Sequence, residues 1–103
     1  MEYSSFDAII IGGSYAGLSA AMTLGRSLRT VLIIDAGEPC NRFSAHSHNF
    51  VTHDGEVPSN ISAKAREQVL QYKTVQLLKG KAAAAIKQDD QFKVTLESGE
   101  SFI

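Results

Sequence analysis

The sequence predicts an α/β fold in which a βαβαβ unit with parallel strands, over about residues 6–79, precedes an antiparallel β-meander over about residues 82–103. Short apolar runs alternate with stretches whose apolar residues recur at helical spacing, a pattern typical of parallel strands buried on both faces and their crossover helices. After Gly80 the pattern changes to short strands separated by turn residues, which is typical of antiparallel hairpins. The chain of 103 residues is expected to form part of one domain.

The first half of the unit is a strand, a helix and a second strand. Residues 6–11 form a nearly unbroken apolar run that ends at two glycines, which predicts a buried strand. From residue 15 to about residue 27, small and apolar side chains fall at helical spacing, which predicts a helix. Residues 30–35 repeat the strand pattern and stop at a carboxylate, Asp35.

The second half begins with a polar segment, residues 40–60, whose length and content of His and Asn favour a functional loop. A second helix follows, with Ser59 as its expected N-cap and an apolar stripe that extends to Tyr72. Residues 75–78 predict a third parallel strand. The meander is expected over residues 82–87, 92–97 and 101–103, with its first turn at Asp89-Asp90.

These elements predict a topology with the strand order 3-2-1. Right-handed crossovers would then place both helices on one face of the sheet, and the meander would cover the other face. The first strand has the sequence of a central strand, yet one of its edges would lack a partner within the chain. The sequence therefore predicts an incomplete domain.

Charge and hydropathy exclude several classes of protein. Ten basic and eleven acidic residues give a net charge of -1, and the basic residues are scattered among the acidic ones. Binding to nucleic acid or to a membrane surface needs clustered positive charge. No apolar run approaches the roughly 20 residues that cross a bilayer, and the start does not resemble a signal peptide. We therefore expect a cytoplasmic protein that binds neither nucleic acid nor a membrane.

A glycine-rich motif, Gly-Gly-Ser-Tyr-Ala-Gly at residues 12–17, joins the first strand to the first helix. Gly12 permits the tight turn, the small Ser14 lets the backbone approach a pyrophosphate, and Gly17 lets the helix pack close to the sheet. The pyrophosphate would lie at the positive end of the helix, and Asp35 would accept hydrogen bonds from ribose hydroxyls. The motif predicts a Rossmann-like dinucleotide site, in which Ser14 replaces the usual second glycine. A doubly wound domain that binds no nucleotide is the alternative.

The same residues carry a resemblance to a known family. The segment DAIIIGGSYAGLSAAMTLGRSLRTVLIIDAGEPCNRFSAHSHNFVTHDG resembles the N-terminal FAD-binding segment of thioredoxin-reductase-like flavoproteins, in the pyridine nucleotide-disulfide oxidoreductase superfamily. The likeness is strongest to the branch whose loop contains Asn41-Arg42, His48-Asn49 and Asp54-Gly55. It covers the whole chain, about the first third of such a protein. The resemblance implies FAD in this fold, with NAD(P)H bound by a later fold of the full-length parent.

Cofactor-binding roles follow from the resemblance position by position. The motif would line the pyrophosphate, and the end of the second strand would surround the adenosine ribose. The polar loop would follow the ribityl and phosphate groups and approach the isoalloxazine ring, and the backbone at the start of the meander would face the adenine. The implied residues are Gly12, Gly13, Ser14, Tyr15, Ala16, Gly17, Asp35, Ala36, Gly37, Asn41, Arg42, His48, Asn49, Lys81 and Ala82.

No residue predicts a catalytic acid, base or nucleophile. His46, His48 and His53 suggest a metal site, but the loop offers no further ligands beyond Asp54, and a flavin-pocket or surface role is favoured. Cys40 is the single cysteine, so it cannot form the spaced pair of a disulfide reductase within these residues.

The predicted function is the FAD-binding part of an NAD(P)H-dependent oxidoreductase, which passes electrons through FAD to a disulfide or a small acceptor. Its expected partner is a second copy of the chain or a complementing C-terminal chain. One alternative is a nucleotide-binding module for ADP or NAD without redox activity. Another is a truncated protein that acts only as an oligomerisation partner.

Overall fold

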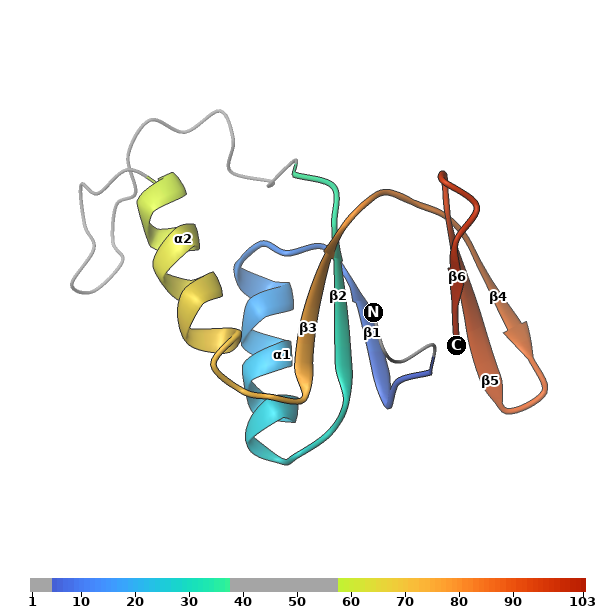
Figure 1. Cartoon of the computed structure of the whole chain (residues 1–103), viewed down its shortest axis with the longest axis horizontal. Coiled ribbons are helices and arrows are strands. Elements are labelled where there is room, and N and C mark those ends of the chain that lie inside the picture. The colour runs from blue at the N-terminus through green and yellow to red at the C-terminus, as the bar shows by residue number, and fades with distance from the viewer. Residues whose placement is uncertain (1–4, 38–57) are drawn as a thin grey trace.

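The computed structural model of the chain describes residues 5–37 and 58–103, and the side chains of residues 5–37 and 63–103. These residues form two helices and six strands, arranged as a parallel and an antiparallel sheet (Figure 1). The predicted fold class is confirmed. In chain order the elements are β1 (Ala8–Ile11), α1 (Tyr15–Arg26), β2 (Val31–Asp35), α2 (Pro58–Val69), β3 (Val75–Lys79), β4 (Ala82–Gln88), β5 (Gln91–Leu96) and β6 (Ser101–Phe102).

The first sheet is parallel and has the order β1-β2-β3, which is the predicted order 3-2-1. The register pairs Ala8 with Val31 and Val31 with Val75. Strand β2 is therefore the central strand, and β1 lies at an edge of the sheet within the described residues. The four apolar residues of β2 are at most 1% exposed, as expected for a parallel strand covered on both faces.

The side chains of β2 contribute alternately to two hydrophobic cores. Val31 and Ile33 pack with Leu18 of α1 and Val69 of α2 in the first core. On the other face of the sheet, residues of the meander close the second core. Its buried members are Leu32, Ile34, Val94, Leu96 and Phe102.

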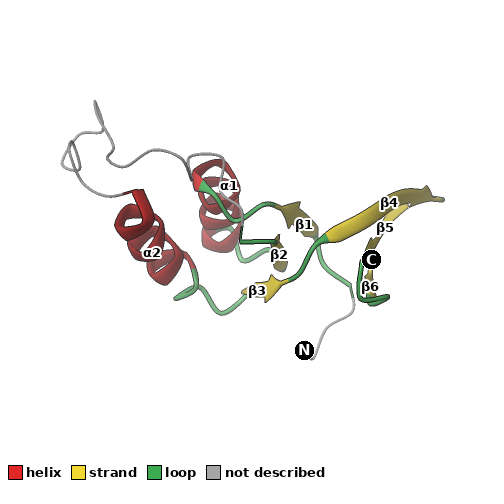
Figure 2. Ribbon diagram, turned by 90° about the horizontal axis from the view of Figure 1, so that it is seen from above, coloured by secondary structure: helices red, strands yellow, loops and turns green. Residues whose placement is uncertain are grey.

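The molecule thus has three layers, with the two helices on one face of the parallel sheet and the meander on the other (Figure 2). This is the arrangement that the strand order and right-handed crossovers predict. The three parallel strands run in the same direction, so their carboxyl ends meet at one edge, in the upper part of Figure 1.

The meander is a second sheet with the order β4-β5-β6. Its first turn lies at Asp89 and Asp90, as predicted, and Asp89 has a φ of 54°. The meander is joined to the start of the chain at Phe6, whose N–H donates to the carbonyl of Ile103 at 2.8 Å. The Phe6 ring also meets the Phe102 ring edge-on, with 6.4 Å between the centroids.

Two predictions of element ends are wrong. Helix α2 begins at Pro58, so Ser59 lies in its first turn and is not the N-cap. Proline is favoured at the first helical position because the missing N–H has no partner there in any case. The helix ends at Val69, and Tyr72 therefore packs against the first core from the turn that follows.

The start of β1 is fixed to the start of β2 by Asp7 and Thr30. The Asp7 carboxylate accepts from the Thr30 N–H at 2.9 Å and from the Thr30 hydroxyl at 3.1 Å. In return, the Asp7 N–H donates to the Thr30 hydroxyl at 2.9 Å. The backbone hydrogen bond from Thr30, then its hydroxyl, hold the pKa of Asp7 below its usual 3.8, and Arg29 acts in the same direction.

This pair predicts a specific pH dependence of stability. Because the folded state lowers the pKa of Asp7, the carboxylate stabilises the fold at pH values above its ordinary pKa, and this contribution is lost as the pH falls through the lowered value. Denaturant unfolding between about pH 5 and pH 2 should therefore show a fall in stability that Asp7→Asn reduces. In Thr30→Val, which keeps the backbone N–H, only part of that fall should disappear. An unchanged pH profile in Asp7→Asn would contradict the assignment.

Candidate functional site

Three chain segments meet at the carboxyl ends of the parallel strands and enclose a pocket of about 250 Å³. They are the loop after β1, the end of β2 and the connection from β3 to β4. In open α/β sheets, ligands bind in the crevice outside the carboxyl ends of the strands. The lining residues are Ile11, Gly12, Gly13, Ser14, Ile34, Asp35, Ala36, Gly80, Lys81 and Ala82.

The glycine-rich loop has the geometry that its sequence predicts. Gly12 has a φ of 114°, which a residue with a Cβ rarely adopts, and its N–H donates to the carbonyl of Ile34 at 2.8 Å. A Cβ on Gly17 would collide with the carbonyl oxygen of Gly12. Gly12 therefore allows the turn, and Gly17 allows α1 to lie close against the loop.

Helix α1 starts directly after this loop and directs its N-terminal end toward the pocket. Ser14 is the N-cap residue, but its side chain makes no capping hydrogen bond, and the first turn contains no acidic residue. The partial positive charge at the start of the helix is therefore not offset by a side chain of that turn, and a bound anion would be stabilised there.

Asp35 forms the second wall of the pocket. Its Oδ1 accepts a hydrogen bond from the N–H of Gly37 at 3.1 Å, and its main-chain carbonyl accepts from the N–H of Gly80 at 2.9 Å. Its carboxylate lies against Gly13, where an added Cβ would be 2.8 Å from Cγ of Asp35. The end of β2 is thus hydrogen-bonded to the turn that follows it and to the residue after β3. The Asp35 carboxylate faces the glycine-rich loop.

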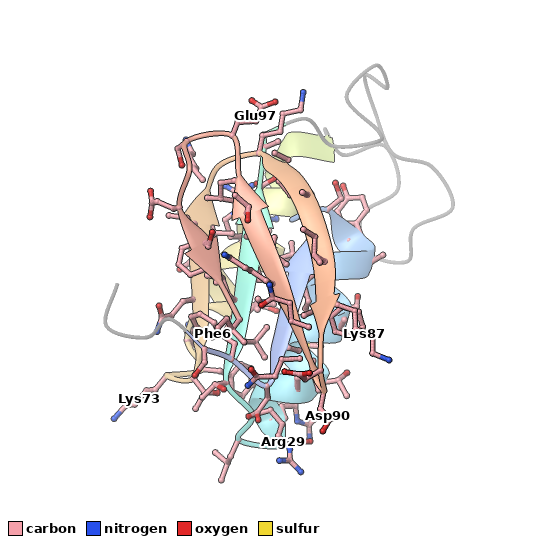
Figure 3. The ribbon with its side chains drawn as sticks, turned by 90° about the vertical axis from the view of Figure 1, so that its right-hand side faces the viewer. Phe6, Arg29, Lys73, Lys87, Asp90 and Glu97 are labelled. Atoms are coloured by element: carbon pink, nitrogen blue, oxygen red, sulfur yellow. The ribbon has the colours of Figure 1, made fainter. Side chains whose placement is uncertain are left out.

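Lys81 lines the third wall. Its ammonium is 4.0 Å from the carboxylate of Glu97, and both side chains are about three-fifths exposed. Figure 3 places Glu97 at the end of the meander opposite Asp90 and Arg29. Because the ion pair is exposed, its contribution to stability is small. The two residues are also joined by a backbone hydrogen bond, in which the N–H of Glu97 donates to the carbonyl of Lys81 at 2.9 Å.

The pocket brings together seven of the residues that the sequence predicts for a cofactor site. Three predicted residues lie nearby without lining it: Gly17 packs on the loop, Gly37 supports Asp35, and Ala16 lies in the first turn of α1. Tyr15 lines a different cavity, of about 190 Å³, between α1 and α2. Four predicted residues lie outside the described residues: Asn41, Arg42, His48 and Asn49. Cys40, His46 and His53 lie outside them too.

Sequence reasoning missed three residues of the pocket, Ile11, Ile34 and Gly80. Ile11 and Ile34 end their strands and were predicted only as apolar strand residues. Gly80 follows β3, and its position after the third predicted strand was a signal that it would reach the same edge of the sheet. Within residues 5–37 and 58–103, no helix is both long and apolar enough to cross a bilayer. The same residues contain no cluster of three metal-ligating side chains.

The fold and the pocket define a class: an α/β protein with a parallel sheet and the crevice, the glycine-rich turn and the acidic strand end of dinucleotide-binding proteins. A family model described as pyridine nucleotide-disulphide oxidoreductase matches residues 6–102. The chain belongs to this family of oxidoreductases, and the resemblance inferred from its residues is confirmed.

Individual relatives agree with this assignment. The chain is 34% identical over 103 residues to thioredoxin reductase sirT of Leptosphaeria maculans. This match covers 97% of this chain and 32% of the relative. It is 32% identical over 99 residues to thioredoxin reductase tcpT of Claviceps purpurea, covering 93% of this chain and 31% of the relative. The crystal structure of an oxidoreductase from Agrobacterium tumefaciens superposes with a TM-score of 0.89 at 46% identity, over 94% of this chain and 33% of that one. The chain thus spans about a third of these proteins.

Proposed function

We propose that this chain is the FAD-binding part of an NAD(P)H-dependent, thioredoxin-reductase-like oxidoreductase, and that its described residues hold the ADP half of FAD. The observation that carries the proposal is the pocket in which the Gly12 turn and the Asp35 carboxylate face each other at the ends of the parallel strands. Location in the cytoplasm is part of the proposal.

The residues present fit an adenosine diphosphate group. The start of α1 is free of acidic side chains in its first turn, which suits a pyrophosphate, and the tight turn at Gly12 lets the backbone come close to it. The Asp35 carboxylate suits the vicinal hydroxyls of a ribose, because an ionised carboxylate offers about four acceptor positions. The volume of about 250 Å³ matches part of a dinucleotide.

In this proposal FAD, when bound, would supply the redox chemistry, which is hydride transfer from NAD(P)H and electron transfer to a disulfide or small acceptor. The part of this chain is to bind and orient the adenosine end. Asn41, Arg42, His48 and Asn49 remain predicted contacts for the ribityl and flavin end.

The proposal is tested by adding FAD to the purified chain and separating bound from free flavin by gel filtration. A yellow protein that releases FAD on denaturation is the expected result. A colourless protein that binds ADP but excludes FAD would support the non-redox nucleotide module instead. A chain that binds neither FAD nor ADP would contradict the proposal and would favour a protein that acts only as an oligomerisation partner.

Replacing Asp35 with alanine should weaken ADP binding by about 1–3 kcal/mol, the usual loss when a charged hydrogen-bond partner is removed. Isothermal titration of ADP into both proteins measures the difference. Glu97→Gln is the matched control, because it removes an acid at the same end of the molecule whose ion pair, with Lys81, is exposed. Equal affinities for the wild type and Asp35→Ala would contradict the assigned ribose contact.

The partner proposed for this chain is a complementing chain that supplies a strand to the free edge of β1, with a second copy as the alternative occupant. Within the described residues β1 pairs only with β2, and Ile11 is 57% exposed. A groove of about 410 Å³ lies between β1 and the meander, with Ile9, Phe92 and Ile103 in its walls. An unpaired apolar strand edge favours pairing with a further strand.

Co-expression with the remaining two thirds of the Agrobacterium oxidoreductase tests this partner. The two chains should co-purify, and Ile11→Lys should prevent it because a charged edge residue opposes strand pairing. Ile86→Lys is the control, since Ile86 is 55% exposed and lies outside the groove. Light scattering that shows a stable dimer without the second chain would favour self-pairing, and a monomer that captures no partner would contradict both.

A further inference from the structure

Gly13 lies directly beneath the carboxylate of Asp35. The residue is buried, and a Cβ built on it would be 2.8 Å from Cγ, 2.9 Å from Oδ2 and 3.0 Å from Cβ of Asp35. Carbon atoms in van der Waals contact are about 3.5–4.0 Å apart, so these distances leave no room for a methyl group. The carboxylate occupies the space that any other residue at position 13 would fill.

The backbone does not explain this glycine. The described glycines with positive φ are Gly12, Gly37 and Gly99, and Gly13 is not among them. Its conformation is therefore open to residues that carry a Cβ. The three atoms nearest to a Cβ at position 13 all belong to the Asp35 side chain.

The opposite side of the carboxylate is held by the turn after β2. The N–H of Gly37 donates to Oδ1 of Asp35 at 3.1 Å, and Gly37 itself needs its φ of 81° to make this turn. A hydrogen bond from Gly37 thus holds the carboxylate on one side. On the other side, the missing Cβ of Gly13 leaves the space that the carboxylate occupies. With one such bond made, both oxygens keep acceptor positions for a ligand.

We propose that Gly13 is a positioning residue, which lets the Asp35 carboxylate lie over the glycine-rich loop where it accepts from both the 2′ and 3′ hydroxyls of the ligand's ribose. The inference rests on the proposed function, and it adds the residue that makes binding depend on the ribose hydroxyls. Because the carboxylate group can rotate about χ1, a methyl at position 13 displaces it, whereas the 3.0 Å contact with Cβ of Asp35 needs only a backbone shift of a few tenths of an ångström.

The test compares ADP with 2′,3′-dideoxy-ADP on the wild type and Gly13→Ala. The variant should remain folded, with a melting temperature within a few degrees of the wild type's, and bind ADP about tenfold more weakly, the effect of losing a hydrogen bond to a charged group. Its affinity for dideoxy-ADP should equal that of the wild type. In an Asp35→Ala background, Gly13→Ala should cause no further loss, because the obstructing carboxylate is gone. Gly25→Ala is the control, since Gly25 lies outside the pocket and its Cβ would meet Val75 and Tyr72 and not Asp35.

An equal loss for both nucleotides, or a loss that adds to that of Asp35→Ala, would overturn the inference, because the methyl would then act by narrowing the pocket. A second measurement needs no ligand. The Gly37 amide proton resonance, moved downfield by its bond to the carboxylate, should shift in Gly13→Ala to its position in Asp35→Ala. If the wild type binds no ADP, the proposed function fails, and this resonance alone decides whether Gly13 positions Asp35. An unmoved resonance would refute it.

Discussion

Replacing Gly17 with alanine is expected to abolish nucleotide binding and to lower the free energy of unfolding by about 3 kcal/mol, the upper end of the usual cost of overpacking. The reason is that the new methyl would overlap the main-chain carbonyl oxygen of Gly12. A backbone atom in a tight turn cannot rotate aside as a side chain can, so α1 must move away from the loop. Thermal unfolding and ADP titration measure the two effects.

Gly25→Ala provides the matched control for Gly17→Ala, because it makes the same substitution in the same helix. There the Cβ would approach the side chains of Val75, at 2.9 Å, and Tyr72. Side chains can give way, and alanine favours the helix over glycine by up to about 1 kcal/mol. Gly25→Ala should therefore retain ADP binding. Equal damage from both substitutions would show that the loop is not what Gly17 accommodates.

Truncating Ile33 to alanine should destabilise the protein by about 3–4 kcal/mol, within the range observed for fully buried Ile and Leu. Ile33 is 0% exposed and sits in the core between the sheet and the two helices. For a domain of this size the loss corresponds to a fall in melting temperature of roughly 15 °C. Urea denaturation of the wild type and the variant gives the free energies directly.

Ile86→Ala serves as the comparison for the core substitution, since Ile86 of β4 is 55% exposed. Its truncation should cost less than about 1 kcal/mol, because little apolar area returns to water. A small effect of Ile33→Ala, or a large one of Ile86→Ala, would mean that the buried and exposed faces have been assigned incorrectly.

The sequence predicted the architecture well because burial on both faces leaves a strong pattern. Four successive apolar residues before Asp35 predict a central strand of this kind, and the structure buries all four. Crossover handedness then places the helices and the meander on opposite faces. The ends of elements were harder to predict, as at Ser59, because several residues near a helix start can act as the cap.

The two main parts of the candidate site were predicted, and in its third part Lys81 and Ala82 were predicted whereas Gly80 was not. The glycine-rich turn and Asp35 are recognisable because each needs a particular residue type, whereas Gly80 reaches the pocket only through the way β3 is placed beside β2. The contact between Gly13 and Asp35 also depends on tertiary structure. Tyr15 lines a different cavity from the rest of the motif, because its position in the motif does not decide which way the side chain turns.

The alternation of β2 has a consequence for how the protein unfolds. Val31 and Ile33 belong to one core and Leu32 and Ile34 to the other, so one strand of five residues contributes to both layers. Neither the helices nor the meander can separate from the sheet without exposing apolar side chains of this strand to water. Opening one side therefore weakens the strand on which the other side depends. The two layers should melt together in a single cooperative transition, and the amide protons of β2 should be among the slowest in the described residues to exchange with solvent.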